Sequence, residues 1–281
     1  MNSITLNAHA KINLSLDVVG KRPDGYHNIE LIFLEIPLWD EVTVTLRDDG
    51  IINLTCDDKT LPTDEKNIAY KAAKAFFKEY GENLGCDIAL KKNIPHGAGL
   101  AGGSADAAGV LKGLNELLDF PFTQEKLMEI GVTLGADVPF CIMGGCAFAE
   151  GIGEILTPLP KPEGLYYLLI KPEESISTAY VYQNLDLNKK PENMNISAVI
   201  DAIKNNDHQA LYKYSGNLME DVAAGKCPVI YDIKDELMKN GAKKALMSGS
   251  GTTVFGIFDD KSVAEKAFEN LKSSYNRIYL V

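Results

Sequence analysis

The sequence predicts an α+β protein, on three observations. Segments typical of strands and segments typical of helices are mixed along the chain without strict alternation. The 281 residues, with 46% hydrophobic content, are enough for one large or two modest domains with a sizeable core. A stretch with three prolines, 158–164, is the best candidate boundary, so we expect domains over 1–160 and 161–281. Two adjoining α/β sandwiches with a cleft between them fit this pattern.

In the first half of the chain, hydrophobic alternation and turn residues predict the elements. The expected strands are 4–19, 39–55 with a break at a turn over 48–50, 88–90, and 147–153 with its turn. The expected helices are 68–80, 104–118 and 124–134. Asn67 is a plausible N-cap for the first of these helices, and Gly81 stands just past its end.

The second half is expected to be richer in helices. Amphipathic helices are predicted over 196–205, 208–223, 228–240 and 262–271. Strands are predicted over 166–170, 244–247, 252–258 and 277–281, with a glycine-serine turn at 248–251.

The amino-acid composition indicates which binding partners and which cellular compartment to expect. The chain has 28 lysines and arginines and 39 aspartates and glutamates, so its net charge is 28 − 39 = −11. Nucleic acid and anionic membranes are therefore not expected partners. The five cysteines contain no C-x-x-C pair, which indicates reduced thiols in a cytoplasmic protein. The N-terminus has no signal-peptide pattern, and no apolar run approaches the roughly 18 residues that span a bilayer. We expect a monomer or a weak homodimer.

The most informative stretch is 95–109, where four glycines precede a helix-forming run. Glycine allows positive φ and lets a ligand approach the main chain closely. Consecutive amides in such a turn form an anion-binding nest, and the N-terminus of the following helix adds its positive dipole end. The expected ligand is therefore a phosphate chain, and a glycine-rich surface loop is the alternative. The run matches neither a Walker A loop nor a dinucleotide-binding spacing.

Lys11, Asn13 and Asp137 are candidates for chemistry. Lys11 and Asn13 are two residues apart on a predicted strand and so project from one face, which is alternatively the solvated face of an edge strand. Asp137 lies in a tight segment after a predicted helix, between apolar neighbours. Its carboxylate could take the proton of a substrate hydroxyl or hold that hydroxyl in line with a phosphoryl group. The alternative is an aspartate that caps or turns the chain.

Two further features suggest a ligand. Tyr26 and His27 follow the turn-forming run 22–25, and with Tyr182 they could sandwich a planar base. Ordinary, partly buried rings on a loop are the alternative. The glycine-serine turn at 248–251 is either a plain hairpin connection or a loop that packs against the phosphate loop and closes a cleft.

Together these motifs resemble the GHMP kinases, the family named for galactokinase, homoserine kinase, mevalonate kinase and phosphomevalonate kinase. A strand with Lys11, the glycine loop 95–108 and the turn 248–251 occur in the family's order. The resemblance implies a domain like the second domain of ribosomal protein S5 followed by a ferredoxin-like C-terminal domain, with the active site in the cleft between them. It also implies ATP and Mg²⁺ as cofactors.

Within the family, the resemblance is greatest to members that phosphorylate the 2-hydroxyl of a cytidine-diphosphate-linked methylerythritol in the non-mevalonate isoprenoid pathway. The runs that carry it are 10–14, 22–27, 99–104 and 135–140. The run 22–27 is the most specific, because other GHMP kinases have no cytosine to hold. A kinase of the mevalonate, homoserine or sugar type is the alternative. A non-catalytic sensor would be expected to lack the lysine or the aspartate, and both are present.

The resemblance assigns roles residue by residue. Asp137 would be the catalytic base, and Lys11 would stabilise the attacking oxygen beside it. The implied substrate contacts are Asn13, Tyr26, His27, Tyr182 and Gly249. The implied ATP contacts are Asn67, Lys92, Pro95, His96, Gly97, Ala98, Gly99, Leu100, Ala101, Gly102, Gly103 and Ser104.

The magnesium ligands stay open. Members of the group often carry two serines where this chain has Ser104 and Ala105. Either Ser104, the backbone and Asp106 serve the metal together, or Asp106 only complements the dipole of the helix.

Overall fold

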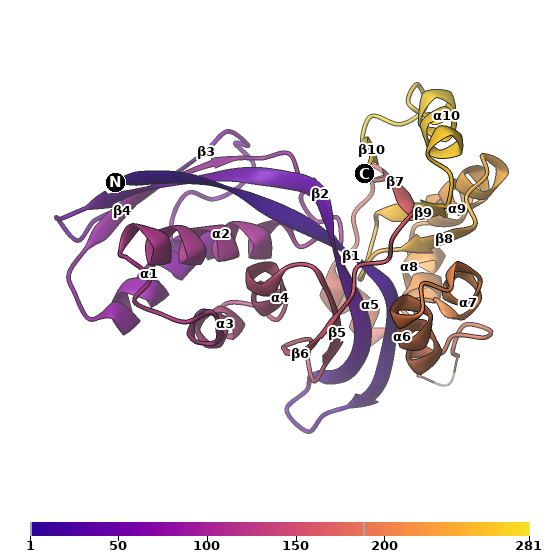
Figure 1. The fold of residues 1–281 in the computed structure, drawn as a ribbon, viewed down its shortest axis with the longest axis horizontal. Coiled ribbons are helices and arrows are strands. Elements are labelled where there is room, and N and C mark those ends of the chain that lie inside the picture. The colour runs from indigo at the N-terminus through magenta and orange to yellow at the C-terminus, as the bar shows by residue number, and fades with distance from the viewer. Residues whose placement is uncertain (1, 188) are drawn as a thin grey trace. The chain divides into compact units, whose positions relative to one another are not determined.

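The computed structural model describes residues 2–187 and 189–281, and the predicted α+β class is confirmed (Figure 1). The strands are β1 (Ser3–Lys21), β2 (His27–Arg47), β3 (Ile52–Cys56), β4 (Gly85–Lys91), β5 (Cys146–Glu150), β6 (Ile155–Leu159), β7 (Tyr166–Ile170), β8 (Lys244–Met247), β9 (Val254–Phe258) and β10 (Ile278–Leu280). The helices are α1 (Ile68–Tyr80), α2 (Gly102–Leu117), α3 (Gln124–Val132), α4 (Val138–Met143), α5 (Thr178–Gln183), α6 (Ile196–Lys204), α7 (His208–Tyr214), α8 (Glu220–Lys226), α9 (Val229–Lys239) and α10 (Lys261–Leu271).

These elements form two compact units that are interleaved along the chain. The first unit comprises the chain up to residue 11, together with 37–96 and 101–144. The second comprises 12–36, 97–100 and 145–281. The predicted domains, 1–160 and 161–281, are continuous ranges, whereas these units are interleaved. The boundary at residue 160 stays a prediction.

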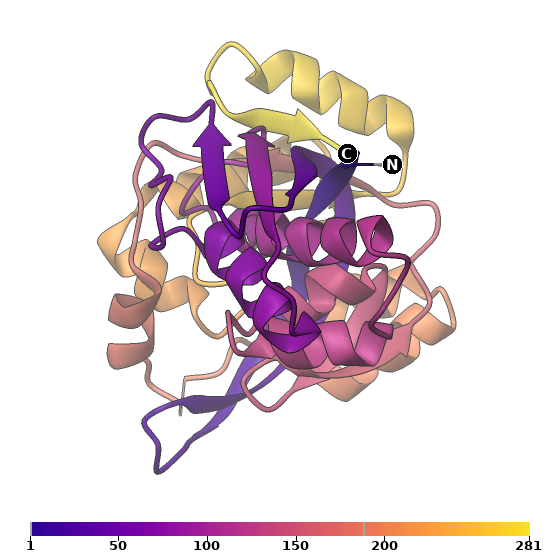
Figure 2. The ribbon, with the colours of Figure 1, turned by 90° about the vertical axis from the view of Figure 1, so that its left-hand side faces the viewer.

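The first unit is a sheet with helices on one face (Figures 1 and 2). β4 lies between β3 and β2, and β1 pairs with β2. Helices α1 and α2 pack against each other, and α2 lies directly on β2. Gly109 and Gly113 favour this close approach, because a Cβ on them would lie 3.0 Å from Val42 and 3.2 Å from Val44, respectively, closer than most real Cβ contacts. The two glycines thus allow α2 to lie close to β2.

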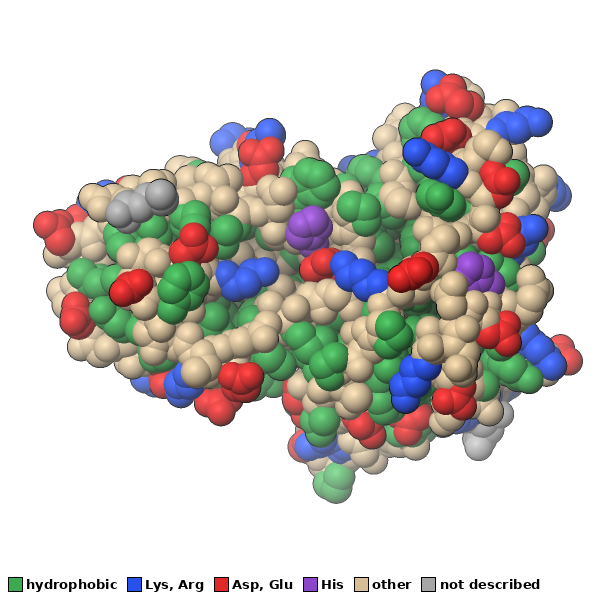
Figure 3. All heavy atoms as spheres, in the orientation of Figure 1, with side chains coloured by type: hydrophobic (Ala, Val, Ile, Leu, Met, Phe, Trp, Pro, Cys, Tyr) green, Lys and Arg blue, Asp and Glu red, His purple; other side chains and the backbone are tan. Residues whose placement is uncertain are grey.

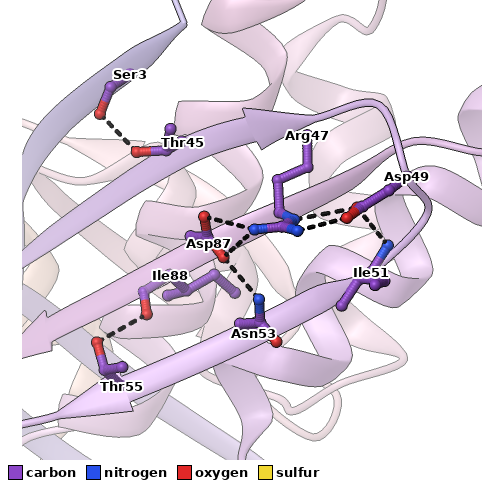
Figure 4. A network of polar contacts seen from close by, with 9 residues as sticks. All are labelled: Ser3, Thr45, Arg47, Asp49, Ile51, Asn53, Thr55, Asp87 and Ile88. Atoms are coloured by element: carbon purple, nitrogen blue, oxygen red, sulfur yellow. Dashed lines mark hydrogen bonds and ion pairs between the residues drawn. The ribbon is translucent and has the colours of Figure 1, made fainter.

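A polar network holds the turn between β2 and β3 (Figure 4). Arg47 donates from Nε to Asp49 Oδ1 at 3.0 Å and from Nη1 to Asp87 Oδ2 at 3.1 Å. Asn53 Nδ2 donates to the other oxygen of Asp87 at 2.8 Å. The hydrogen bond from Arg47 is the main reason why the pKa of Asp49 falls to about 2. The turn lies at 48–50, where the sequence predicts it.

The second unit contains an antiparallel sheet in the order β10–β7–β9–β8. Helices α5 to α9 separate β7 from β8, and α10 separates β9 from β10. This is the ferredoxin-like arrangement that the resemblance implies, so that prediction is confirmed. Helix α10 packs on β7 and β10 (Figure 2), and α9 packs on β8 and β9. The hairpin of β5 and β6 pairs with the first part of β2, where Phe33 lies opposite Ala147.

The prediction of one helix over 208–223 is wrong. The chain forms α7 and α8 there, with 215–219 between them. In this connection Gly216 O accepts from Leu16 N at 2.9 Å, and Leu218 N donates to Leu16 O at 3.0 Å. Pairing with β1 satisfies these backbone groups, and Gly216 has a low intrinsic helix propensity. The helical pattern is therefore interrupted where a strand offers partners.

The proline-rich stretch begins inside a strand. Pro158 belongs to β6, opposite Ala147 of β5. β6 lies at one end of the strand order, where a proline without an N–H is tolerated. β6, the first part of β2 and the short helices α4 and α5 lie in segments where we predict no helix or strand.

Candidate active site

Lys11 and Asp137 form an ion pair within the first unit. Lys11 Nζ lies 3.4 Å from Asp137 Oδ2, and the two side chains are 5% and 34% exposed. Lys11 and Asn13 are buried on β1, so the interpretation of this face as a solvated edge is wrong. Asp137 stands at the N-cap position of α4 but makes no capping hydrogen bond. Its carboxylate is thus open on one side and backed by a buried positive charge on the other.

The glycine loop has the backbone of an anion nest. Gly97, Gly99 and Ala101 have φ values of 61°, 75° and 59°, so every second residue is left-handed. Alternation of this kind turns successive amides toward a common point. Ala101 is the N-cap of α2 and offers no side-chain cap, which leaves the first amides of the helix to a ligand. This geometry supports the predicted phosphate loop.

The glycine-serine turn packs against the phosphate loop and is more than a hairpin connection. Ser248 Oγ donates to Gly99 O at 3.0 Å, and Thr253 N donates to Ala98 O at 3.3 Å. A Cβ on Gly99 would lie 2.2 Å from Ser248 O, so only glycine permits this approach. Of the two interpretations left open by the sequence, packing against the phosphate loop is confirmed. The turn also carries Gly249, a predicted substrate contact.

A buried charge cluster flanks both ends of the phosphate loop. Lys92 precedes the loop and pairs with Asp40 of β2 and with Asp106 of the first turns of α2, and each of these side chains is at most 8% exposed. Asp40 Oδ1 also accepts from the backbone N–H groups of Asn93 at 2.6 Å and Ile94 at 2.8 Å. The cluster therefore joins a strand, the start of the loop and the helix after it.

The cluster shifts the titration of its members. Burial raises the pKa of Asp106 to about 7, opposed by the attraction of Lys92 and aided by the charge of Asp40. Burial lowers the pKa of Lys92, but the attraction of Asp106 and Asp40 together outweighs it, and that pKa is raised. One lysine between two buried carboxylates carries one positive charge against two negative ones. A proton on Asp106 removes the excess negative charge.

The described side chains do not assemble a metal site. No group of three His, Cys, Asp or Glu residues that could hold a metal ion occurs in the part of the chain that the structure describes. Asp106 is paired with Lys92, so of its two predicted roles a metal ligand fits poorly.

Two predicted ATP contacts use their side chains for the fold. Asn67 Oδ1 accepts from Ala69 N at 2.9 Å as the N-cap of α1, and Asn67 Nδ2 donates to Pro62 O at 2.8 Å. The ammonium group of Lys92 lies between Asp40 and Asp106. A nucleotide contact by Asn67 or Lys92 therefore has to come from backbone or alkyl atoms.

His27 and Tyr182 lie together in the second unit. Their rings are stacked, with centroids 5.0 Å apart and planes inclined by 23°. A base between them would need about 7 Å, twice the usual contact distance of about 3.5 Å between stacked carbon atoms. In this structure the two rings contact each other, so a base either separates them or stacks on an outer face of the pair. The predicted sandwich is not preformed.

The loop before His27 is held in shape by its own side chains. Arg22 Nη2 lies 2.9 Å from Asp24 Oδ2, and Asp24 Oδ1 accepts from Tyr26 N at 3.1 Å. The hydrogen bond from Arg22 is the main reason why the pKa of Asp24 is lowered. Gly25 supplies the turn with a φ of 91°. Tyr26 is 61% exposed, so its ring is available for a ligand.

Other surfaces are less suited to the predicted chemistry. A hollow on the first unit is lined mainly by residues of β2, β3 and β4, among them Thr43, Thr45, Asn53, Thr55 and Asp87, and none of the predicted site residues lines it. On the face drawn in Figure 3, basic side chains stand among acidic ones. Within the described residues, the helices are too short or too polar to cross a membrane.

Sequence reasoning missed one residue that holds the glycine-serine turn. Asn217 lies in the connection between α7 and α8, and its amide donates to two carbonyls of the turn, Met247 O and Gly249 O. It fell within a segment that was predicted to be helical. Gly216, in the middle of that segment, was the one available indication of a break.

Comparisons with known proteins find two GHMP kinase domains along the chain. The model of the GHMP kinases N-terminal domain matches residues 67–145, and the model of the GHMP kinases C-terminal domain matches residues 199–277. The chain is 45% identical over 281 residues to the 4-diphosphocytidyl-2-C-methyl-D-erythritol kinase of Alkaliphilus metalliredigens, covering 100% of this chain and 97% of that protein. It is 48% identical over 274 residues to the enzyme of the same name from Acetivibrio thermocellus, covering 98% and 96%.

Solved structures are similar over the whole chain. A crystal structure of 4-(cytidine 5'-diphospho)-2C-methyl-D-erythritol kinase has a TM-score of 0.83 and 31% identity, covering 99% of this chain and 98% of that one. Homoserine kinase from Cytophaga hutchinsonii has a TM-score of 0.79 and 22% identity, covering 100% and 93%, and it shares the fold. The predicted two-domain fold is thereby confirmed.

Proposed function

The chain belongs to the GHMP kinases and, within them, to the 4-diphosphocytidyl-2-C-methyl-D-erythritol kinases, and we propose that it phosphorylates the 2-hydroxyl of 4-diphosphocytidyl-2-C-methyl-D-erythritol with ATP. This reaction belongs to the non-mevalonate route to isoprenoid precursors. The observation that carries the proposal is the pair of buried Lys11 and partly exposed Asp137, 3.4 Å apart. A kinase that acts on an alcohol needs such a carboxylate and positive charge where the hydroxyl reacts.

Asp137 acts as the base and orients the acceptor. Its carboxylate accepts the proton of the 2-hydroxyl while the oxygen forms a bond to the γ-phosphorus of ATP. The bond from that phosphorus to the β–γ bridging oxygen breaks, and ADP leaves. Lys11 lies beside the carboxylate and stabilises negative charge on the attacking oxygen. Phosphoryl transfer depends chiefly on such positioning and charge neutralisation.

The phosphate chain of ATP binds to the loop from Pro95 to Ser104. The left-handed residues turn amides toward the phosphates, and the uncapped N-terminus of α2 adds its dipole. Magnesium bound to the phosphates would supply further positive charge there. We keep Asn67 and Lys92 as neighbours of the nucleotide through their backbone and alkyl atoms.

The cytidine end binds at the aromatic residues of the second unit. His27 offers ring nitrogens to the cytosine edge, and Tyr26 and Tyr182 offer aromatic faces. Asn13 and Gly249 complete the proposed substrate contacts. This aromatic group favours a cytidine substrate over mevalonate or homoserine, which have no base to stack.

An ADP-release assay with Mg-ATP tests the proposal. It compares 4-diphosphocytidyl-2-C-methyl-D-erythritol with mevalonate, homoserine and galactose as acceptors. We expect turnover of the cytidine substrate alone. Turnover of another alcohol would support a kinase activity but contradict the proposed acceptor. No turnover despite ATP binding would indicate a nucleotide sensor. We further propose that the enzyme acts in the cytoplasm as a monomer or weak homodimer. Sedimentation of the purified protein tests the oligomeric state.

A further inference from the structure

The buried side chain of Asn217 holds the glycine-serine turn through hydrogen bonds. Asn217 Nδ2 donates to Met247 O and to Gly249 O, both at 2.8 Å, and Asn217 Oδ1 accepts from Met219 N at 2.9 Å. The residue is 3% exposed, so these bonds are shielded from water. Both amide hydrogens and the amide oxygen are therefore in use. The two carbonyls that the amide holds are those on either side of Ser248.

Ser248 in turn holds the phosphate loop. Its hydroxyl donates to Gly99 O at 3.0 Å, and its carbonyl oxygen would lie 2.2 Å from a Cβ on Gly99. The turn and the loop are thus in direct backbone contact, and a small shift of Ser248 displaces Gly99. Because Gly99 is one of the left-handed residues of the anion nest, its position decides where the neighbouring amides point.

The segment that carries Asn217 is itself fixed at both ends. Ser15 Oγ on β1 donates to Gly216 O at 3.0 Å and accepts from Gly216 N at 3.2 Å. On the other side, Glu220 Oε2 accepts from Met247 N at 2.8 Å, while Glu220 Oε1 pairs with Lys234. Asn217 therefore links the turn to a segment that is held by its own hydrogen bonds and by an ion pair.

We propose that Asn217 is a positioning residue for the nucleotide: through Met247, Ser248 and Gly249 it fixes the phosphate loop in the conformation that binds phosphate. The amide is required because both turn groups that it meets are acceptors. Aspartate has almost the same shape but, when ionised, donates no hydrogen bond and would repel both carbonyls. This inference rests on the proposed function only for the identity of the nucleotide.

The test compares Asn217 with a second buried asparagine. Asn115 is 5% exposed, its Nδ2 donates to Phe122 O at 3.0 Å, and its Oδ1 accepts from Phe122 N at 3.0 Å. Asn115 holds a connection after α2 and makes none of these contacts with the turn or the loop. Asn217→Asp removes two buried hydrogen bonds donated by the amide and Asn115→Asp removes one, and only the first variant acts on the turn. ADP affinity is measured by calorimetric titration, and stability by the midpoint of thermal unfolding.

We expect both aspartate variants to lower the midpoint, and only Asn217→Asp to weaken ADP binding, by about tenfold or more. If an aspartate variant fails to fold, Asn217→Ala and Asn115→Ala replace the pair, since they bury no charge. Unchanged ADP affinity in the folded Asn217 variant would overturn the inference, and so would an equal loss in the Asn115 variant.

A double-mutant cycle with Ser248→Ala tests the route of the effect. If Asn217 acts on Gly99 through Ser248, the losses of ADP affinity in Asn217→Ala and Ser248→Ala are less than additive in the double variant. Additive losses would overturn the route. Because the readout is ADP binding, a wild-type protein that binds ADP but fails to phosphorylate the cytidine substrate would reject the proposed function and leave this test intact. If the wild-type protein does not bind ADP, the proposal that the loop binds phosphate is wrong, and so is this inference.

Discussion

Two aspartates at helix N-caps, Asp137 and Asp207, differ in what their side chains contact. Asp207 stands at the N-cap of α7 and accepts from Ala210 N at 3.0 Å, whereas Asp137 stands at the N-cap of α4 and faces Lys11 instead. Asp137→Asn is expected to reduce kcat by about 10²–10⁴-fold, because the amide cannot accept the proton of the hydroxyl. Steady-state kinetics with the cytidine substrate check this.

The matched control is Asp207→Asn. Asparagine caps helices about as well as aspartate, so this variant keeps both its kcat and its thermal midpoint. A folded Asp137→Asn enzyme with full activity would contradict the role of Asp137 as base.

Asp106 gives the stability of the protein a pH dependence. Its pKa is raised from its ordinary value of 3.8 to about 7 in the folded state, chiefly by burial. The folded protein therefore holds a proton between these pH values that the unfolded chain releases. The stability due to this proton is complete below about pH 4 and is lost as the pH rises through about 7.

The variant Asp106→Asn removes this titration. We expect the difference in unfolding free energy, wild type minus Asp106→Asn, to fall as the pH rises from about 4 to about 7. Urea unfolding of both proteins across this range measures the difference. A difference that stays constant or rises would show that Asp106 is already ionised in the folded protein at low pH.

At the scale of an element, the phosphate loop depends on two glycines for different reasons. Gly97 and Gly99 both have positive φ, but a Cβ on Gly97 would meet only Ser175 Oγ at 3.9 Å, whereas a Cβ on Gly99 would collide with Ser248 O. Gly97→Ala therefore costs about 1–2 kcal/mol of unfolding free energy for its left-handed backbone. Gly99→Ala costs about 1–3 kcal/mol more, because the turn and the loop must move apart.

Chemical denaturation and ADP titration of the two variants check this order. Gly99→Ala should also lose more ADP affinity than Gly97→Ala. Equal losses in stability and affinity would mean that backbone conformation alone, and not contact with the turn, makes Gly99 necessary.

Elements with local causes could be predicted from the sequence. Asn67 caps α1 with its own side chain and Gly81 ends that helix in a left-handed conformation, and both features depend on a few neighbouring residues. Gly216 alone indicated the break between α7 and α8, and its cause could not be predicted, because the partner of Gly216 is Leu16, 200 residues earlier in the chain. Helical periodicity carries no information about such a partner.

The site shows the same division. The glycine loop was predicted because the amide nest and the helix behind it are contiguous in sequence. The pairing of Lys11 with Asp137 was implied by resemblance alone, since spacing places neither residue near the other. The cluster of Lys92, Asp40 and Asp106 was missed, because three charged residues on separate elements usually indicate solvated positions.

At the scale of the whole molecule, the two compact units are built from alternating segments of one chain. Residues up to 11 and residues 12–36 belong to different units, although β1 and β2 are continuous strands across that division. Unfolding one unit would therefore release strand residues that continue into the other. We expect the units to lose their structure together, in one cooperative transition.

The cysteines report on this cooperativity. All five are buried thiols outside disulfides: Cys56, Cys86 and Cys141 in the first unit, and Cys146 and Cys227 in the second. Burial raises the pKa of Cys86 and of Cys146 to about 12, so little reactive thiolate forms in the folded protein. We expect a thiol reagent to modify them only after unfolding. Mass mapping of labelled peptides over time follows each cysteine separately.

ADP sharpens this prediction, because a ligand that binds only the folded protein reduces the unfolded population. At about 100 times its Kd, ADP adds about 2.7 kcal/mol, which slows labelling about a hundredfold wherever a thiol is exposed by global unfolding. Cooperative units require that this protection be equal for Cys86 and Cys227, although they lie in different units. Protection of one without the other would mean that the units unfold separately. Rapid labelling of any cysteine in the native protein would contradict its burial.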